Sequence, residues 1–266
     1  MLGKIRFNIW KNRYLFLKKK KYPERLVYNR IYAVEIHKKN ILPYMNKFEG
    51  KSVAIFGSGP TLKFYEPQEE GIINMGVNNT YLNDKINFDF LFLQEDSSEI
   101  DLQKVVDYRA GKCKKFFGVI SDTMYEYMKD YTIRYNGSGA TRIPLKYYNN
   151  PDVSAYVLEE VVETTLPYNI GYEPFGDWHG SIFSTLQFAL YTNPKRIYVV
   201  GNDCGVGHYS DRQKGSKSNF TANIAMWKKM KEYIDEYYPH VEIVSVNPVG
   251  LKGLFKDVYT KSYGEH

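Results

Sequence analysis

A glycine-rich turn, Gly57-Ser-Gly-Pro-Thr-Leu62, is the part of this sequence best suited to bind a phosphate group. It follows the apolar run Val53–Phe56, which is typical of a strand buried on both faces of a parallel sheet. Gly57 and Gly59 offer backbone freedom and bare amides, and Pro60 suits the first turn of a helix. Because a helix N-terminus attracts anions, this strand, turn and helix start predict a nucleotide site.

Two common phosphate loops differ from this turn. The dinucleotide-binding fingerprint requires glycine at the position of Leu62, and a Walker loop requires Gly-Lys-Ser/Thr after four spacer residues, which is absent here. An ordinary strand-to-helix turn with incidental glycines is the alternative interpretation. The residues that end the later strands favour the nucleotide site.

Polar residues also end the other strands expected from the sequence. A second strand within Gly71–Thr80 ends near Asn78, and a third within Phe88–Asp96 ends near Gln94. The later apolar run Arg196–Asp203 ends in Gly-Asn-Asp, whose aspartate alone would equally suit a turn cap. In an open parallel sheet the carboxyl ends of the strands line one crevice, where ligands bind.

The overall pattern predicts an α/β fold with a Rossmann-like, open and mostly parallel sheet flanked by helices. The other elements expected are a helix over Leu26–Phe48, a strand over Lys114–Ser121, helices over Ile182–Tyr191 and Thr221–Tyr238, and a last strand over Val241–Val246.

We expect residues 1–50 to form a basic, aromatic N-terminal arm and helix, and residues 51–266 to form a nucleotide-binding domain. Residues 125–175 are rich in tyrosine, and they are interpreted as an insertion or lid that binds an acceptor substrate. Their tyrosines fit core and edge positions equally well. A chain of 266 residues with 43% hydrophobic residues can bury one large core or two small ones.

The cysteines and the hydropathy favour the cytoplasm. Cys113 and Cys204 stand in different motifs without metal-ligand spacing, so neither a zinc site nor a disulfide framework is predicted. No apolar run reaches the roughly 18 residues that a membrane span requires, and no signal-type apolar core follows Met1.

Positive charge is concentrated at the N-terminus. Residues 1–51 hold 14 Lys and Arg against three Glu, while the rest of the chain holds 22 basic and 27 acidic residues. In residues 1–21 basic residues alternate with aromatic and aliphatic ones, which predicts a peripheral contact with an anionic membrane at its inner face. A solvated arm or a homo-oligomer contact is the alternative. The acidic remainder carries no recognisable nucleic-acid module, so no nucleic-acid partner is expected.

The order of these motifs resembles the bacterial sialyltransferases of glycosyltransferase family 42, together with motility accessory proteins and archaeal pterin pyrophosphokinases. The matching segments are Gly57–Leu62, Val77–Asn79, Gly180-Ser181 at a helix start, and Ile197–Asp203. The resemblance spans roughly residues 52–250 and leaves the basic arm outside.

In those sialyltransferases the glycine turn and the asparagine after the second strand bind the cytidine nucleotide, and Gln94 stands where a second such asparagine is expected. Amide side chains suit this role because they offer both a donor and an acceptor. The nucleotide-binding residues that the resemblance implies here are Gly57, Ser58, Gly59, Pro60, Thr61, Asn78, Gln94, Gly180, Ser181, Gly201 and Asp203.

Three positions depart from the family's pattern. Its threonine-serine pair appears as Gly180-Ser181, its carboxylate-binding arginine is replaced by Trp178 or displaced, and its catalytic histidine is missing near Asn219. His208, which follows the Gly-Asn-Asp turn, and His179, which precedes a helix start, are the candidates for a general base.

The function expected is a metal-independent, inverting glycosyltransferase that moves an acidic sugar of the sialic acid or Kdo type from a CMP donor to a surface glycan or its lipid-linked precursor, as in lipopolysaccharide or capsule synthesis. The sequence holds no Asp-x-Asp motif, which disfavours a magnesium-bound nucleotide diphosphate, and no cofactor is expected. The alternatives are a pterin pyrophosphokinase-like enzyme and a catalytically inactive nucleotide-binding protein at the membrane surface.

Overall fold

The computed structural model describes residues 31, 34–94, 101–120, 150–160, 166–167, 169–177, 180–205 and 217–264. Nine strands in these ranges form one sheet, in the order β6-β5-β4-β3-β2-β1-β7-β8-β9, and every neighbouring pair is parallel. The predicted open α/β sheet is therefore confirmed. The strands are β1 (Ser52–Phe56), β2 (Ile73–Val77), β3 (Phe90–Leu93), β4 (Lys114–Ile120), β5 (Val153–Glu160), β6 (Phe175–Asp177), β7 (Arg196–Val200), β8 (Glu242–Val246) and β9 (Lys256–Val258).

The central strands are buried on both faces, as their unbroken apolar sequences require. All five residues of β1 and all four of β3 are buried, and four of the five in β7 and in β8. The order in which the chain adds strands reverses at β1. Strands β2 to β6 are added one after another on one side of β1, and the chain then returns to place β7 on the other side. The carboxyl ends of β1 and β7 therefore form the topological switch point, where open α/β sheets bind ligands.

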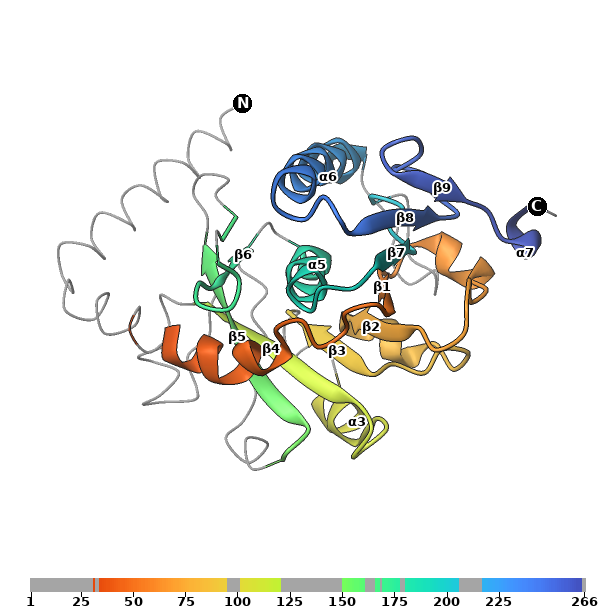
Figure 1. Cartoon of the computed structure of the whole chain (residues 1–266). Coiled ribbons are helices and arrows are strands. Elements are labelled where there is room, and N and C mark those ends of the chain that lie inside the picture. Colours follow the sequence, from red (N-terminus) through yellow and green to blue (C-terminus); the bar gives the residue numbers. More distant parts are fainter. Residues whose placement is uncertain are drawn as a thin grey trace, which may run out of the picture.

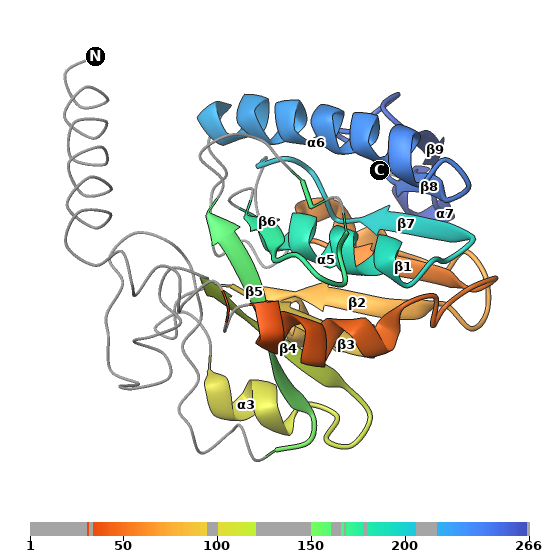
Figure 2. The same cartoon turned by 60° about the vertical axis from the view of Figure 1, so that its left-hand side comes forward.

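Helices cover the two faces unequally (Figures 1 and 2). One face packs against α5 (Ser181–Tyr191), α6 (Lys217–Tyr237) and a helical segment at residues 34–41, with Phe188 in contact with the rings of Phe90, Phe92 and Phe116. The other face packs against α3 (Leu102–Asp107) and against turns. The short α7 (Lys261–Gly264) ends the described chain beside the segment that follows β1.

Short 3₁₀ helices replace α-helices after the first two strands. They are η2 (Pro60–Phe64) after β1 and η3 (Asn78–Leu82) after β2, while η1 (Leu42–Tyr44) precedes the sheet. The chain leaves η2 at Tyr65 in an extended conformation, and Pro67 disfavours a helical conformation at Glu66, the residue before it. The helix predicted to start at the glycine turn is thus a single 3₁₀ turn.

Two predicted boundaries differ from the structure. The helix expected over Leu26–Phe48 is helical at residues 34–41 and ends at η1, where Pro43 interrupts the hydrogen-bond ladder. Within the predicted insertion at residues 125–175, β5 and β6 extend the sheet beyond β4. Residues 125–149, 161–165 and 168 of that predicted insertion or lid, and the basic arm at residues 1–21, lie outside the described residues. No helix in the described ranges is long and apolar enough to cross a bilayer.

A buried histidine fastens the helical segment at residues 34–41 to the far edge of the sheet. His37 is fully buried, its Nε2 donates to the carbonyl of Ile170 at 2.8 Å, and its ring meets Phe175 edge-on at 4.7 Å. Its Nδ1 has no partner in the part of the chain that the structure describes. Burial lowers the pKa of His37 to about 4, so the neutral ring is the native form.

This burial predicts a loss of stability in mild acid. Below pH 6.5 the unfolded chain protonates His37 while the folded chain does not, so the free energy of unfolding should fall by about 3 kcal/mol as pH drops from 6.5 to 4. Urea unfolding across this range should show a smaller fall for His37→Leu than for the wild type. His240→Leu, at an exposed histidine, is the control variant.

Candidate functional site

The backbones that follow β1 and β7 approach each other so closely that both need glycine. The Gly57 amide donates to the Val200 carbonyl at 2.8 Å, and the Gly59 amide donates to the Gly201 carbonyl at 2.8 Å. A Cβ on Gly57 would lie 2.6 Å from the Gly201 carbonyl oxygen, and Gly201 adopts a φ of +62°. The expectation of bare amides at Gly57 and Gly59 is therefore wrong: the Gly57 amide is bonded to the last residue of β7 and the Gly59 amide to the turn after it.

A buried carboxylate holds the glycine turn in place through hydrogen bonds. Asp203 is 3% exposed, and its two oxygens accept from the Thr61 amide at 2.8 Å and from the Thr61 hydroxyl at 2.7 Å. Burial raises the pKa of Asp203, and the two bonds from Thr61 oppose that shift. A Cβ on Gly59 would lie 2.5 Å from Asp203 Oδ2, so this glycine makes room for the carboxylate. Asp203 therefore holds the glycine turn in place, and both oxygens of its carboxylate already accept hydrogen bonds.

A second polar side chain joins the ends of two strands to a helix. Asn78 has a φ of +46°, a left-handed conformation that asparagine tolerates better than most residues. Its Oδ1 accepts from the Gln94 amide at 2.9 Å, and its Nδ2 donates to the Ser181 hydroxyl oxygen at 3.0 Å. The carboxyl ends of β2 and β3 and the N-terminus of α5 are thus held together by one amide group.

These turns surround a cavity of about 230 Å³ at the switch point between β1 and β7. Eight of the predicted nucleotide-binding residues line it: Gly57, Ser58, Gly59, Asn78, Gly180, Ser181, Gly201 and Asp203. The other three lie next to it. Pro60 and Thr61 continue into η2, and Gln94 is 8% exposed behind Asn78. Gln94 Oε1 is buried without a hydrogen-bond partner among the described residues.

The N-terminus of α5 faces this cavity, and no side chain among the described residues caps it. Gly180 is the N-cap residue, and it accepts the first helical bond from the Phe183 amide at 3.0 Å. Gly180 to Phe183 line the cavity, and α5 runs for 11 residues, so the first backbone amides of the helix and the positive end of its dipole are directed at the cavity. This terminus, rather than the glycine turn, is where an anion would be stabilised best.

The opposite wall comes from residues that the sequence analysis did not single out as ligand contacts. Asn223 and Trp227 lie one turn apart on α6, and Trp227 packs on Phe183 with ring centroids 5.2 Å apart. Asn202 also lines the cavity while its Nδ2 donates to the Val200 carbonyl at 2.9 Å. Asn223 stands four residues before Trp227, so the two side chains lie on the same side of α6.

Cys204 contributes to the cavity as a protonated thiol. It is 6% exposed and adopts a φ of +60°. Burial, with a smaller effect from Asp203, raises its pKa to about 12. In the described ranges no group of three or more His, Cys, Asp or Glu residues is arranged to hold a metal ion. The candidate bases His179 and His208, and also Trp178, lie outside the described residues.

No family model matches the sequence, and no curated protein matches it. Three solved structures resemble the fold. A MAf glycosyltransferase from Magnetospirillum magneticum aligns with a TM-score of 0.42 at 12% identity, over 86% of this chain and 38% of that protein, so the chain spans well under half of its length. A sialyltransferase CST-II in complex with a trisaccharide acceptor and CMP aligns with a TM-score of 0.35 at 11% identity, over 80% of this chain and 88% of that protein. The Campylobacter jejuni sialyltransferase CstII in complex with a substrate analogue, cytidine-5'-monophosphate, aligns with a TM-score of 0.35 at 14% identity, over 74% of this chain and 80% of that protein.

These neighbours are glycosyltransferases, and two are sialyltransferases, the class that the order of motifs in the sequence resembles.

Two glycines of the cavity provide a matched test of its geometry. Gly59→Ala should lower both stability and nucleotide affinity, because its Cβ would meet Asp203 Oδ2 at 2.5 Å and the Gly201 carbonyl at 2.7 Å. We expect a loss of about 1–3 kcal/mol in the free energy of unfolding. Gly180→Ala should be tolerated, because its nearest neighbour, Phe183 Cδ2, would lie 3.4 Å away. Urea unfolding of both variants checks this, and equal losses would contradict the close packing described at Gly59.

Proposed function

We propose that this protein is a glycosyltransferase that takes an acidic sugar from a CMP donor bound in the cavity between β1 and β7. The observation that carries the proposal is the uncapped N-terminus of α5, which faces a cavity whose other walls hold the amides of Asn202 and Asn223. An anion site beside donor and acceptor groups, at the switch point of a parallel sheet, suits a nucleotide.

The phosphate of the donor would lie at the N-terminus of α5. There it accepts from backbone amides of the first turn, and the hydroxyl of Ser181 remains a donor because its oxygen already accepts from Asn78. Gly180 leaves this approach open, since it carries no side chain. Asn202 and Asn223 would contact the nucleoside, where their amides can satisfy base or ribose groups.

The transfer itself requires the α5 terminus to stabilise charge on the leaving group. The acceptor hydroxyl attacks the anomeric carbon while a general base takes its proton, and the bond from that carbon to the phosphate oxygen breaks. CMP then leaves with the bonding electrons, as a phosphate monoester held by fixed N–H donors. Attack from the side opposite the phosphate inverts the anomeric centre. In this proposal the fixed donors take the place of a metal ion.

The choice of CMP and of an acidic sugar is supported by the motif order that the sequence shares with family 42 sialyltransferases. The acceptor in this proposal is a glycan or a lipid-linked precursor. The basic arm at residues 1–21 supports an acceptor at an anionic membrane surface, because lysine and arginine residues beside aromatic ones bind such surfaces.

Calorimetric titration with CMP, UDP, GDP and ADP tests the donor. CMP should bind most tightly, and Asn223→Ala should weaken CMP binding about tenfold through the loss of one hydrogen bond. Lys228→Ala, at an exposed position of the same helix, should leave the affinity unchanged. Equal affinity for all four nucleotides would refute the cytidine donor.

Turnover of a CMP-sugar tests the general base. His208→Ala should lower turnover by about 10²–10⁴-fold with CMP affinity nearly intact, because only the transition state uses the proton transfer. If His208→Ala keeps full turnover and His179→Ala loses it, the base is His179. CMP binding without donor hydrolysis or transfer in the wild type would instead identify an inactive nucleotide-binding protein.

A further inference from the structure

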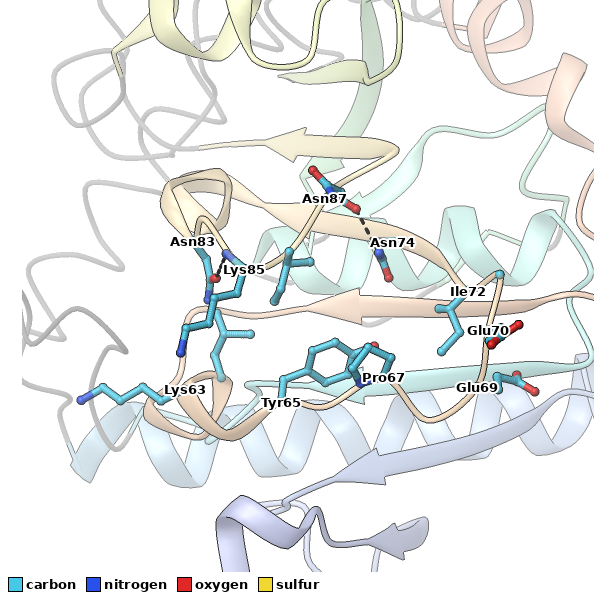
Figure 3. A pocket seen from close by; sticks show the side chains of 13 residues that line it. Lys63, Tyr65, Pro67, Glu69, Glu70, Ile72, Asn74, Asn83, Lys85 and Asn87 are labelled. Atoms are coloured by element: carbon cyan, nitrogen blue, oxygen red, sulfur yellow. Dashed lines mark hydrogen bonds between the residues drawn. The ribbon is translucent and has the colours of Figure 1, made fainter.

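A second cavity lies on the face of the sheet opposite α5 and α6, and none of the residues predicted to bind nucleotide line it. It is a trough of about 400 Å³ bounded by residues 62–72 on one side and residues 83–87 on the other (Figure 3). It exists because η2 and η3, rather than α-helices, follow β1 and β2, so turns alone cover this part of the sheet.

The trough contains a buried acceptor that lacks a donor. Asn74, in β2, donates from its amide nitrogen Nδ2 to the Asn87 carbonyl at 2.9 Å, while its backbone amide donates to Asp89 Oδ2 at 2.9 Å. Its Oδ1 is buried and has no hydrogen-bond partner in the described ranges. Figure 3 shows this oxygen pointing into the trough, toward Pro67 and Ile72. Because an unpaired buried acceptor is costly, a ligand that donates here would be stabilised.

The floor beside Asn74 is aromatic. Tyr65 packs edge-on against Phe56 with ring centroids 4.9 Å apart, and Figure 3 shows its ring next to Pro67 in the middle of the trough. Burial raises the pKa of Tyr65, so its hydroxyl stays protonated at neutral pH. A flat apolar wall with hydroxyl and amide groups at its border suits a sugar ring, which has apolar C–H faces and polar edges.

The two ends of the trough differ in charge. Lys63 and Lys85 stand at one end, and Glu69 and Glu70 at the other, as Figure 3 shows. Lys195 already contacts Glu69 Oε2 at 3.4 Å, so sugar hydroxyls can donate to Glu70 and to Asn74, whereas the lysine end attracts a negative group.

We infer that the trough binds a saccharide that carries an acidic group, with its hydroxyls toward Asn74 and its carboxylate or phosphate between Lys63 and Lys85. The site is independent of the proposed transfer reaction, because its lining residues come from the other side of η2 and the nucleotide takes no part in it. It gives the protein a second contact for an acidic glycan or sugar phosphate, apart from the catalytic cavity.

Titration of the full-length, ¹⁵N-labelled protein with N-acetylneuraminic acid, glucose 6-phosphate and glucose tests this inference. At least one acidic sugar should shift the side-chain amide resonances of Asn74 and Asn87 and bind about fivefold more tightly than glucose. The stronger of the two acids identifies the carboxylate or the phosphate as the preferred group. Absence of these shifts with both acids, or equal affinity for glucose, would overturn the inference.

Charge reversal distinguishes the lysine end from general electrostatics. Lys85→Glu should weaken the acidic sugar about fivefold or more, whereas Lys112→Glu, an exposed lysine that lines neither cavity, should not. Asn74→Leu should weaken it about tenfold. Because that variant also loses its bond to Asn87, Lys85→Glu decides the matter if Asn74→Leu does not fold.

CMP titration in the same samples keeps the two proposals separate. Lys85→Glu should leave CMP affinity unchanged, since Lys85 does not line the nucleotide cavity. Loss of acidic-sugar binding with intact CMP binding supports the trough as a site of its own. Equal loss of both ligands would mean that the variant disturbs the fold around η2, and would overturn the assignment of Lys85 to sugar binding.

Discussion

The shape of the cavity between β1 and β7 depends on the pair of hydrogen bonds that Thr61 donates to the Asp203 carboxylate, at 2.8 and 2.7 Å. No cation among the described residues forms a salt bridge with Asp203, so these two bonds are what offsets the loss of hydration at a site 3% exposed. They fix the first residues of η2 against the turn after β7. The glycine turn is consequently a fixed wall of the cavity, and the amides of Gly57, Gly59 and Thr61 donate to other protein groups in that wall.

Asn78 fixes the other side of the cavity through hydrogen bonds, as Asp203 fixes the glycine turn. Its two hydrogen bonds, to the Gln94 amide and the Ser181 hydroxyl oxygen, join β2, β3 and α5. Residues that look like ligand contacts in the sequence thus serve first as structural ties. The groups left for a ligand are the first turn of α5 and the side chains of Asn202 and Asn223, which differ from those that a phosphate-loop reading would choose.

The sequence predicts the core of the fold well, because its central strands are unbroken apolar runs that end in glycine or amide residues. Eight predicted residues meet in one cavity for the same reason: parallel strands bring their carboxyl ends to one edge. Strands β5 and β6 were missed because Val153–Glu160 ends in two glutamates and lies in a tyrosine-rich stretch. Asn223 was missed because the periodicity of α6 marks only its apolar residues. The hydrogen bonds that occupy Gly57 and Gly59 depend on where β7 returns, which local sequence does not encode.

Charge also decides how a nucleotide can be oriented in this cavity. Both oxygens of Asp203 accept hydrogen bonds from Thr61, which is the arrangement of an ionised carboxylate, so its negative charge lies next to the glycine turn. Burial raises the pKa of Asp203, and the two bonds from Thr61 oppose that shift. Two like charges 4 Å apart repel by about 4 kcal/mol at an effective dielectric constant of 20. A phosphate is therefore disfavoured beside Gly59 and favoured at the N-terminus of α5, on the side of Gly180 and Ser181. The uncharged ribose and base are then left to the walls formed by the turn after β7 and by α6. This arrangement reverses the one suggested by the glycine-rich sequence alone, and it follows from a single buried carboxylate.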